Sequence, residues 1–254
     1  MASAVSRGEA SAAPLRGELR YGFELARLLA DRDFLRPVRR RHEPPVLLIP
    51  GFMAGDQSLS VLAGWLRRRG SRTSGAGLVL NADCAERAVG AAESRLRRLA
   101  DRAGRPAVLI GQSRGGALAR VAAQRNPELA RAVVMLGSPV VAPLDVGPAV
   151  ISAVRSIAWL GDIGVPGMLS SECRDGPCCE GFREDLRAPL PERVRGISIY
   201  SRSDGIVSWE ACLDPGAEHV EVDSSHTGMS VNVEVFRVLA RVLDEEEDAR
   251  RAAA

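Results

Sequence analysis

The residues best suited to chemistry centre on a serine in the pentapeptide Gly111-Gln112-Ser113-Arg114-Gly115. Four apolar residues, 107–110, precede this pentapeptide, and an alanine-rich segment, 117–123, follows it. The pattern predicts a buried strand, a sharp turn and a helix, with the Ser113 hydroxyl projecting from the edge of a sheet. Glycine suits positions 111 and 115 because a side chain at either would collide with the neighbouring strand or helix. Ser113 is therefore a candidate nucleophile; the alternative is a glycine-rich turn that contains a serine by chance.

A serine hydroxyl needs a base to take its proton and a third group to hold that base in the right tautomer. The sequence contains only three histidines, so they can be compared directly. His42 lies among arginines and is expected at the surface, and His219 begins a predicted strand, where a structural role fits equally well. His226 follows the last predicted strand in a polar loop, where catalytic groups of an open α/β sheet gather. We predict that His226 is the general base; the alternative is an ordinary loop histidine.

A candidate partner for this histidine stands one strand earlier, in Ser203-Asp204-Gly205. The Asp204 carboxylate could accept a hydrogen bond from Nδ1–H of His226, although an Asp-Gly pair is also a common turn. The chain order Ser113, Asp204, His226 is the order of α/β-hydrolases and differs from the orders of serine proteases. Three such residues in this order, each at a strand end, favour a catalytic triad over three unrelated loop residues.

A second turn follows the apolar run 46–49 and has the sequence Pro50-Gly51-Phe52-Met53. A glycine-flanked turn after a strand can present backbone N–H groups to an oxyanion. The N–H of Phe52 is the first candidate donor, with that of Met53 as a second.

The rest of the chain alternates predicted strands with predicted helices. Buried strands are expected at 46–49, 107–110 and 132–136, and further strands at 196–200 and 219–222, with a shorter one within 72–80. Helices are expected at 15–35, 59–70, 85–103 and 231–243, and a further helix follows Ser113 and ends at Asn126-Pro127. This alternation predicts an α/β fold with a mostly parallel central sheet and helices on both faces.

The predicted organisation is one domain, 15–243, preceded by a disordered Ala/Ser-rich segment, 1–14, and followed by a charged tail, 244–254. A length of 254 residues does not require a second domain. The alternation breaks at about 140–190, which contains proline and glycine signals, one short apolar stretch, Ala149 to Leu160, and a cluster of cysteines. An insertion over the carboxyl edge of the sheet is where a lid or cap would lie.

Composition excludes several classes of protein. A net charge of +2 gives no argument for binding nucleic acid, and no apolar run reaches the roughly 20 residues of a membrane span. Because no apolar signal-peptide segment is seen, we expect a cytoplasmic protein. The basic segment 15–41 could contact a lipid surface, or it could pack on the domain with its arginines in solvent. The oligomeric state is left open.

Five cysteines are present, at positions 84, 173, 178, 179 and 212. Their spacing lacks the paired C-x-x-C of a zinc site, so no metal is expected. One or two disulfides that clamp a loop, or buried free thiols, remain as alternatives.

Taken together, the chain resembles the α/β-hydrolase family, in particular bacterial lipase- and esterase-like members. The resemblance covers roughly 45–243. It is carried by Ile49-Pro-Gly-Phe52, Gly111-Gln-Ser-Arg-Gly115, Leu136-Gly-Ser-Pro139, Ile199-Tyr-Ser-Arg-Ser-Asp-Gly-Ile-Val207 and Ser225-His-Thr-Gly-Met229. The chain also resembles actinobacterial hydrolases with the same Ser-Arg-Ser-Asp-Gly-Ile-Val and double-cysteine segments.

The resemblance implies a serine hydrolase without a cofactor, acting on a small-molecule or lipid ester through an acyl-enzyme on Ser113. It assigns His226 as base, Asp204 as orienting acid, and the backbone N–H groups of Phe52 and Arg114 as the oxyanion hole. A thioesterase or acyltransferase with the same triad is the alternative reaction, and a non-catalytic binding module is the alternative class.

Two positions depart from the family pattern. Many lipases have histidine where this chain has Pro50, although the backbone donor remains available. Arg114 is bulkier than the methionine or leucine usual after the nucleophile. Its guanidinium would either favour an anionic or polar acyl group or point into solvent.

Overall fold

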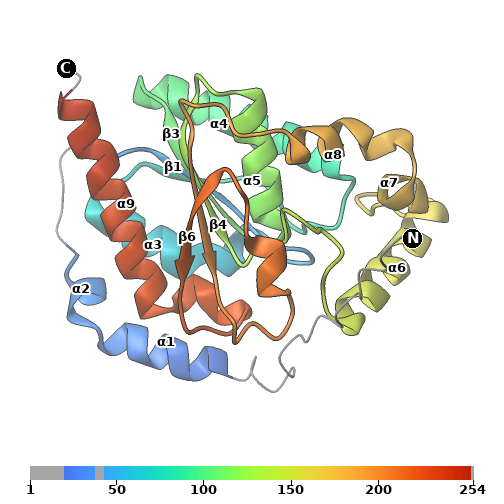
Figure 1. Cartoon of the computed structure of the whole chain (residues 1–254), viewed down its shortest axis with the longest axis horizontal. Coiled ribbons are helices and arrows are strands. Elements are labelled where there is room, and N and C mark those ends of the chain that lie inside the picture. The colour runs from blue at the N-terminus through green and yellow to red at the C-terminus, as the bar shows by residue number, and fades with distance from the viewer. Residues whose placement is uncertain (1–19, 38–42, 253–254) are drawn as a thin grey trace, which may run out of the picture.

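The computed structural model describes residues 20–37 and 43–252, and in these residues six strands form one parallel sheet. The order across the sheet is β2-β1-β3-β4-β5-β6, and the sheet lies at the centre of the molecule (Figure 1). The strands are β1 (Val46–Ile49), β2 (Thr73–Gly75), β3 (Ala107–Gln112), β4 (Ala130–Leu136), β5 (Arg195–Tyr200) and β6 (Ala217–Glu221). Every neighbouring pair is parallel, which confirms the predicted fold class.

Helices cover both faces of this sheet (Figure 1). One face packs against α4 (Ala85–Ala103), α5 (Arg114–Arg125) and α8 (Glu180–Arg187). The other packs against α1 (Tyr21–Ala30), α2 (Arg32–Leu35), α3 (Ser60–Arg69) and α9 (Val233–Ala252). The remaining elements are α6 (Pro148–Asp162), α7 (Ser171–Asp175), η2 (Asp56–Leu59), η3 (Pro177–Cys179), η4 (Trp209–Cys212) and η5 (Thr227–Val231).

The side chains of β3 explain why its sequence is an uninterrupted apolar run. Ala107 and Leu109 belong to the core under α4 and α5, whereas Val108 and Ile110 belong to the core under α3 and α9. All four residues are fully buried. A central parallel strand that is covered on both faces has no polar side, so its sequence cannot alternate.

The expected strand within 72–80 is only partly correct. Strand β2 ends at Gly75, and the apolar residues 78–80 lie in a loop in which Val79 is 87% exposed. Gly77 adopts a φ of +82°, which no strand continues, and the Asp56 carboxylate accepts a hydrogen bond from its N–H at 2.8 Å. The carboxylate and the left-handed glycine turn the chain away from the sheet.

The expected helix 15–35 is divided in two within the described residues. Asp31 is extended, and its carboxylate accepts hydrogen bonds from the N–H groups of Asp33 and Phe34, which starts α2. Phe23 and Leu29 on α1 are 63% and 52% exposed. Residues 1–19 and 38–42, with the predictions of a disordered N-terminus and of a surface His42, lie outside the described residues.

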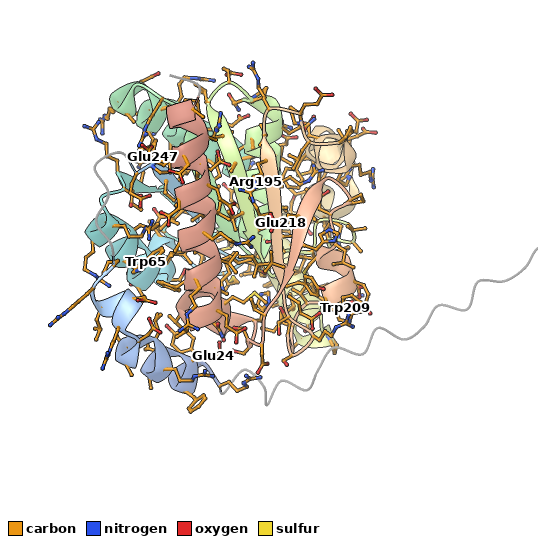
Figure 2. All side chains as sticks on the ribbon, turned by 60° about the vertical axis from the view of Figure 1, so that its left-hand side comes forward. Glu24, Trp65, Arg195, Trp209, Glu218 and Glu247 are labelled. Atoms are coloured by element: carbon orange, nitrogen blue, oxygen red, sulfur yellow. The ribbon has the colours of Figure 1, made fainter. Side chains whose placement is uncertain are left out.

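The closing helix is longer than predicted, because α9 continues from Leu243 to Ala252. Its acidic residues pair with arginines of the sheet: Glu245 with Arg195 at 2.7 Å and Glu246 with Arg131 at 2.6 Å. Figure 2 shows α9 running along the sheet beside Arg195 and Glu218. These ion pairs hold the charged segment 244–252 on the domain.

The segment 140–190 contains three α-helices with different surroundings. Helix α8 packs on α5, and its Phe182 and Leu186 are buried in the sheet core. Helices α6 and α7 lie to the side of the sheet at the right of Figure 1. Among the described helices, none combines the length and apolar character that crossing a bilayer requires.

Candidate active site

Ser113 occupies the tight turn between β3 and α5. Its φ of +54° and ψ of −128° are strained for a residue with a side chain. The turn is held by hydrogen bonds from the Ser113 N–H to Leu136 O at 2.8 Å and from the Gly116 N–H to Ser113 O at 2.9 Å. Ser113 remains half-buried, so its hydroxyl is within reach of a ligand.

The glycines around Ser113 are required by close backbone contacts, as predicted. A Cβ at Gly111 would overlap the backbone of Gly115, and a Cβ at Gly115 would lie 2.5 Å from Pro50 O. The start of α5 is therefore pressed against the end of β1. This contact brings the turn after β1 beside the turn that holds Ser113.

Asp204 and His226 form a buried pair at the carboxyl ends of β5 and β6. Nδ1 of His226 lies 2.6 Å from Oδ2 of Asp204, and the two residues are 5% and 4% exposed. The second carboxylate oxygen, Oδ1, accepts hydrogen bonds from the N–H groups of Ile206 and Val207, both at 2.8 Å. The carboxylate is thus fixed by backbone donors on one side and by the imidazole on the other.

Two neighbours lie against this pair, one at the end of β3 and one directly after β4. Nε2 of Gln112, the residue before Ser113, donates to His226 O at 3.0 Å. Gly137, at the end of β4, has a φ of +53°, and a Cβ there would lie 3.1 Å from Asp204 Oδ2 and 3.2 Å from His226 Nδ1. Any side chain at Gly137 would press on the Asp204–His226 pair.

The turn after β1 lies against Ser113. A Cβ at Gly51 would be 3.3 Å from Ser113 Cβ and 3.9 Å from Ser113 Oγ. The N–H of Met53 donates to Asn81 O at 3.0 Å, which removes Met53 as an oxyanion donor. Within 20–37 and 43–252, the backbone N–H groups of Phe52 and Arg114 have no acceptor, so both can serve a ligand.

The Arg114 side chain does not point into solvent. Its guanidinium donates to Asn81 Oδ1 at 3.0 Å and to Asp83 O at 2.5 Å, and it lies 5.8 Å from the centre of the Phe52 ring. Burial lowers the pKa of this guanidinium from its ordinary value, and the nearby sulfur atoms of Cys179 and Cys84 oppose the shift. Arg114 therefore fastens the loop before α4 to the start of α5.

Asn81 is a site residue that the sequence did not reveal. It is fully buried, and its Nδ2 donates to Pro50 O at 2.7 Å while its own O accepts from Met53. It therefore holds both ends of the turn that contains Phe52. The sequence feature that could have indicated Asn81 is its position directly after the apolar residues 78–80. Those residues were expected to form a strand rather than this loop.

Glu24 of α1 is a second residue that was missed. Its carboxylate is buried and accepts hydrogen bonds from Ser225 N at 2.8 Å, Ser225 Oγ at 2.9 Å and Ser224 Oγ at 2.6 Å. These serines immediately precede His226. The sequence feature that could have indicated Glu24 is its place four positions before Leu28, which puts an acidic residue on the buried face of the predicted helix.

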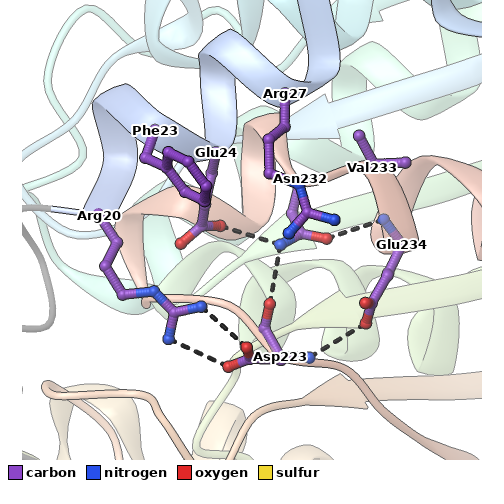
Figure 3. Close-up of a pocket in the computed structure, with 8 residues that line it drawn as sticks. All are labelled: Arg20, Phe23, Glu24, Arg27, Asp223, Asn232, Val233 and Glu234. Carbon is purple, nitrogen blue, oxygen red and sulfur yellow. Dashed lines mark hydrogen bonds and ion pairs between the residues drawn. The ribbon is translucent and has the colours of Figure 1, made fainter. Parts of the chain in front are cut away.

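Glu24 also reaches a small surface pocket beneath α1 (Figure 3). Asn232 Nδ2 donates to Glu24 Oε2 and to Asp223 O, both at 3.0 Å, and Arg20 pairs with the Asp223 carboxylate at 2.9 Å. The polar atoms in this pocket bond mainly to one another. Neither Ser113 nor His226 lines it, so this pocket is not part of the candidate site.

The other described histidine takes no part in this arrangement. His219 lies on β6, where its Nε2 is 2.7 Å from Asp214 O. It therefore has a structural partner, which was the alternative considered for it.

Comparison of structures identifies the architecture, whereas no family model and no curated protein sequence matches the chain. The mature form of the Bacillus licheniformis lipase BlEst2 superposes with a TM-score of 0.59 at 16% identity, over 81% of this chain and 94% of that one. A soluble variant of the Saccharomyces cerevisiae monoglyceride lipase, in complex with a substrate analog, superposes with a TM-score of 0.56 at 12% identity. The superposition covers 82% of this chain and 88% of that one. The chain has the α/β-hydrolase fold.

A further similar structure is the thioesterase domain from the curacin biosynthetic pathway, with a TM-score of 0.50 at 15% identity, over 81% of this chain and 92% of that one. In the α/β-hydrolase fold of the present chain, Ser113, Asp204 and His226 follow β3, β5 and β6. All three therefore lie at the carboxyl edge of one parallel sheet.

Proposed function

We propose that the protein is a serine hydrolase that cleaves carboxylic esters through an acyl-enzyme on Ser113. The observation that carries the proposal is the buried contact of 2.6 Å between Asp204 Oδ2 and His226 Nδ1, on the same sheet edge as the strained Ser113 turn. The lipase and monoglyceride lipase structures that share the fold support the same reaction class.

In the proposed first step, Ser113 Oγ attacks the ester carbonyl and Nε2 of His226 takes the hydroxyl proton. Asp204 accepts a hydrogen bond from Nδ1–H, which keeps Nε2 free as the base and stabilises the imidazolium. His226 then returns the proton to the leaving alcohol. Water, activated in the same way, attacks the acyl-enzyme and releases the acid and free Ser113.

The proposed oxyanion hole consists of the N–H groups of Phe52 and Arg114. Both lack an acceptor in the described residues, and the Phe52 turn lies against the Ser113 side chain. Fixed donors of this kind stabilise the charge that develops on the carbonyl oxygen in the transition state. The bonds from Asn81 make this turn rigid before substrate binds.

An apolar acyl group is the favoured substrate portion. Phe52 packs against a buried cluster that includes Ile157 and Ala158 of α6 and Leu169, so apolar side chains of the segment 140–190 lie beside the proposed oxyanion turn. We propose that α6 acts as the lid of the predicted insertion, because α8 is bound into the sheet core instead. A thioester is the second candidate, supported by the thioesterase domain of the same fold.

Contact with a lipid surface through the segment 15–41 is a separate part of the proposal. Phe23, Leu29 and Leu35 are all more than half exposed on α1 and α2, next to Arg27 and Arg32. Sedimentation with anionic vesicles should be stronger for the wild type than for a Phe23→Ser/Leu29→Ser variant. Equal binding of the two proteins would contradict this contact.

The direct test of the function is hydrolysis of p-nitrophenyl esters from acetate to palmitate by the wild type and by Ser113→Ala. We expect turnover by the wild type on at least part of the series, and background rates for the variant. Acyl-thioesters assayed in parallel separate the two candidate substrates. Turnover that is unchanged in Ser113→Ala would overturn the proposal.

A further inference from the structure

Four of the five cysteines meet at one point beside α4, although they are up to 95 residues apart in sequence. Cys84 directly precedes α4, Cys173 lies on α7, and Cys178 and Cys179 lie on η3. Their four sulfur atoms all lie within 4.8 Å of one another. The sequence lacks paired C-x-x-C spacing, but the fold brings these distant cysteines together, so the spacing did not exclude a sulfur cluster.

The sulfur positions do not single out a disulfide. Cys84 Sγ lies 3.4 Å from both Cys178 Sγ and Cys179 Sγ, and Cys173 Sγ lies 3.5 Å from Cys178 Sγ. A tetrahedral Zn²⁺ site with Zn–S bonds of about 2.3 Å separates its sulfur atoms by roughly 3.8 Å. Four mutually close sulfur atoms match this geometry better than two separate pairs.

The charges around the cluster suit bound thiolates. Four thiolates and one Zn²⁺ leave a net negative charge, and the guanidinium groups of Arg87 and Arg114 both interact electrostatically with Cys84 and Cys173. Cys84 and Cys179 are also the residues that cap the amino ends of α4 and α8, where the helix dipole is positive. Cations and helix ends thus offset the charge of the sulfur ligands.

We propose that Cys84, Cys173, Cys178 and Cys179 bind one Zn²⁺ ion in a closed, tetrahedral structural site. Four sulfur ligands leave no open position for substrate, which is the arrangement of structural rather than catalytic zinc. The ion would join three segments that share no strand: the start of α4, helix α7 and η3.

The proposed metal site would connect two segments of the chain near the candidate active site. Ala82, two residues before Cys84, accepts a hydrogen bond at 2.7 Å from Leu169 N, just before α7. Asn81 and Asp83 in the same loop are bound by Arg114. A metal at Cys84 would therefore lock the base of the segment 140–190 to the loop that holds the Phe52 turn.

The test is the metal content of the full chain, purified without chelator or metal-affinity resin and measured by elemental mass spectrometry. The wild type should contain about one zinc per chain. Cys178→Ser, which changes an exposed ligand, should contain less than about a tenth of that. Cys212→Ala is the matched control, because burial raises the pKa of the Cys212 thiol and the residue lies on η4, outside the cluster. It should keep the full zinc content.

Two further measurements distinguish the alternatives. Replacement of the metal by Co²⁺ should give the visible absorption of a tetrahedral cobalt–thiolate site in the wild type and in Cys212→Ala, and not in Cys178→Ser. Chelator should lower the melting temperature of the wild type and leave that of Cys178→Ser unchanged. Iron in place of zinc, fewer than five free thiols in the denatured unreduced chain, or a folded wild type that neither contains nor takes up metal would each overturn the proposal.

Discussion

The Asp204 carboxylate uses its two oxygens for different partners. Oδ2 lies 2.6 Å from Nδ1 of His226, whereas Oδ1 accepts two backbone hydrogen bonds from Ile206 and Val207. The backbone donors hold the carboxylate in one orientation whether or not the imidazole is present. This arrangement makes it possible to change the partner of His226 without changing the turn.

Asp204→Asn is the substitution that uses this property. The amide oxygen can keep the two backbone hydrogen bonds, while the NH₂ group faces Nδ1 and forces the imidazole into the tautomer with Nε2–H. We expect kcat for ester hydrolysis to fall by about 10³–10⁴-fold, and the far-UV circular dichroism spectrum to stay unchanged. Asp214→Asn removes an equally buried carboxylate from an ion pair with Arg120 and should lower stability while sparing kcat. Equal loss of kcat in both variants would contradict the assigned role.

Glu24 is expected to position His226 through the two preceding serines. Glu24→Gln replaces one of two accepting oxygens by an NH₂ group, which then faces the N–H of Ser225 or the Nδ2–H of Asn232. This costs about 1–3 kcal/mol of unfolding free energy. Because the His226 loop shifts, kcat should fall by about 10-fold with little change in KM. Glu43→Gln, at a buried glutamate paired with Arg69, is the control and should lose stability only. A kcat that is unchanged in Glu24→Gln would refute this link.

Asn81 is expected to act on the oxyanion turn. Asn81→Ala removes the donor to Pro50 O and the acceptor for Arg114, so the Phe52 N–H loses its fixed direction. We expect kcat to fall by about 10–100-fold. Asn126→Ala, at a buried asparagine after the other end of α5, should cost similar stability in a urea titration and leave kcat unchanged. Parallel losses of kcat in the two variants would contradict a specific role for Asn81.

Two glycine substitutions test the close packing behind Ser113. A Cβ at Gly115 would lie 2.5 Å from Pro50 O and 2.8 Å from Ile49 C, and neither backbone atom can move easily. Gly115→Ala should therefore destabilise the protein by about 3 kcal/mol. Gly90→Ala, in α4 where no atom lies within 4 Å of the added Cβ, should stabilise it by about 0.5–1 kcal/mol. Similar urea midpoints for the two variants would show that the contact at Gly115 is not rigid.

The central sheet could be predicted because its strands are buried on both faces. β1, β3 and β4 consist almost entirely of apolar residues, and such a run between helical patterns has few other interpretations. Ser113, Asp204 and His226 were predicted for a related reason. Ser113 directly follows the apolar run of β3, while Asp204 and His226 lie in the loops after β5 and β6. Parallel strands place these carboxyl ends on one edge.

The parts that could not be predicted depend on contacts between distant residues. Glu24 meets Ser225 across 201 positions, and Cys84 meets Cys179 across 95. Nothing in the local sequence encodes either contact. The strand expected at 78–80 was wrong for a local reason. Gly77 has a positive φ and donates its N–H to the Asp56 carboxylate, and a pattern of apolar residues does not reveal either feature.

The most direct test of the central claim is reaction with a fluorophosphonate, followed by intact-mass and peptide mass spectrometry. Such a probe bonds only to a serine that a neighbouring base has activated. The wild type should gain one adduct, located on Ser113, and both Ser113→Ala and a folded His226→Ala variant should gain none. An unlabelled wild type, or an adduct on another residue, would contradict the assignment of Ser113, Asp204 and His226 as a catalytic triad.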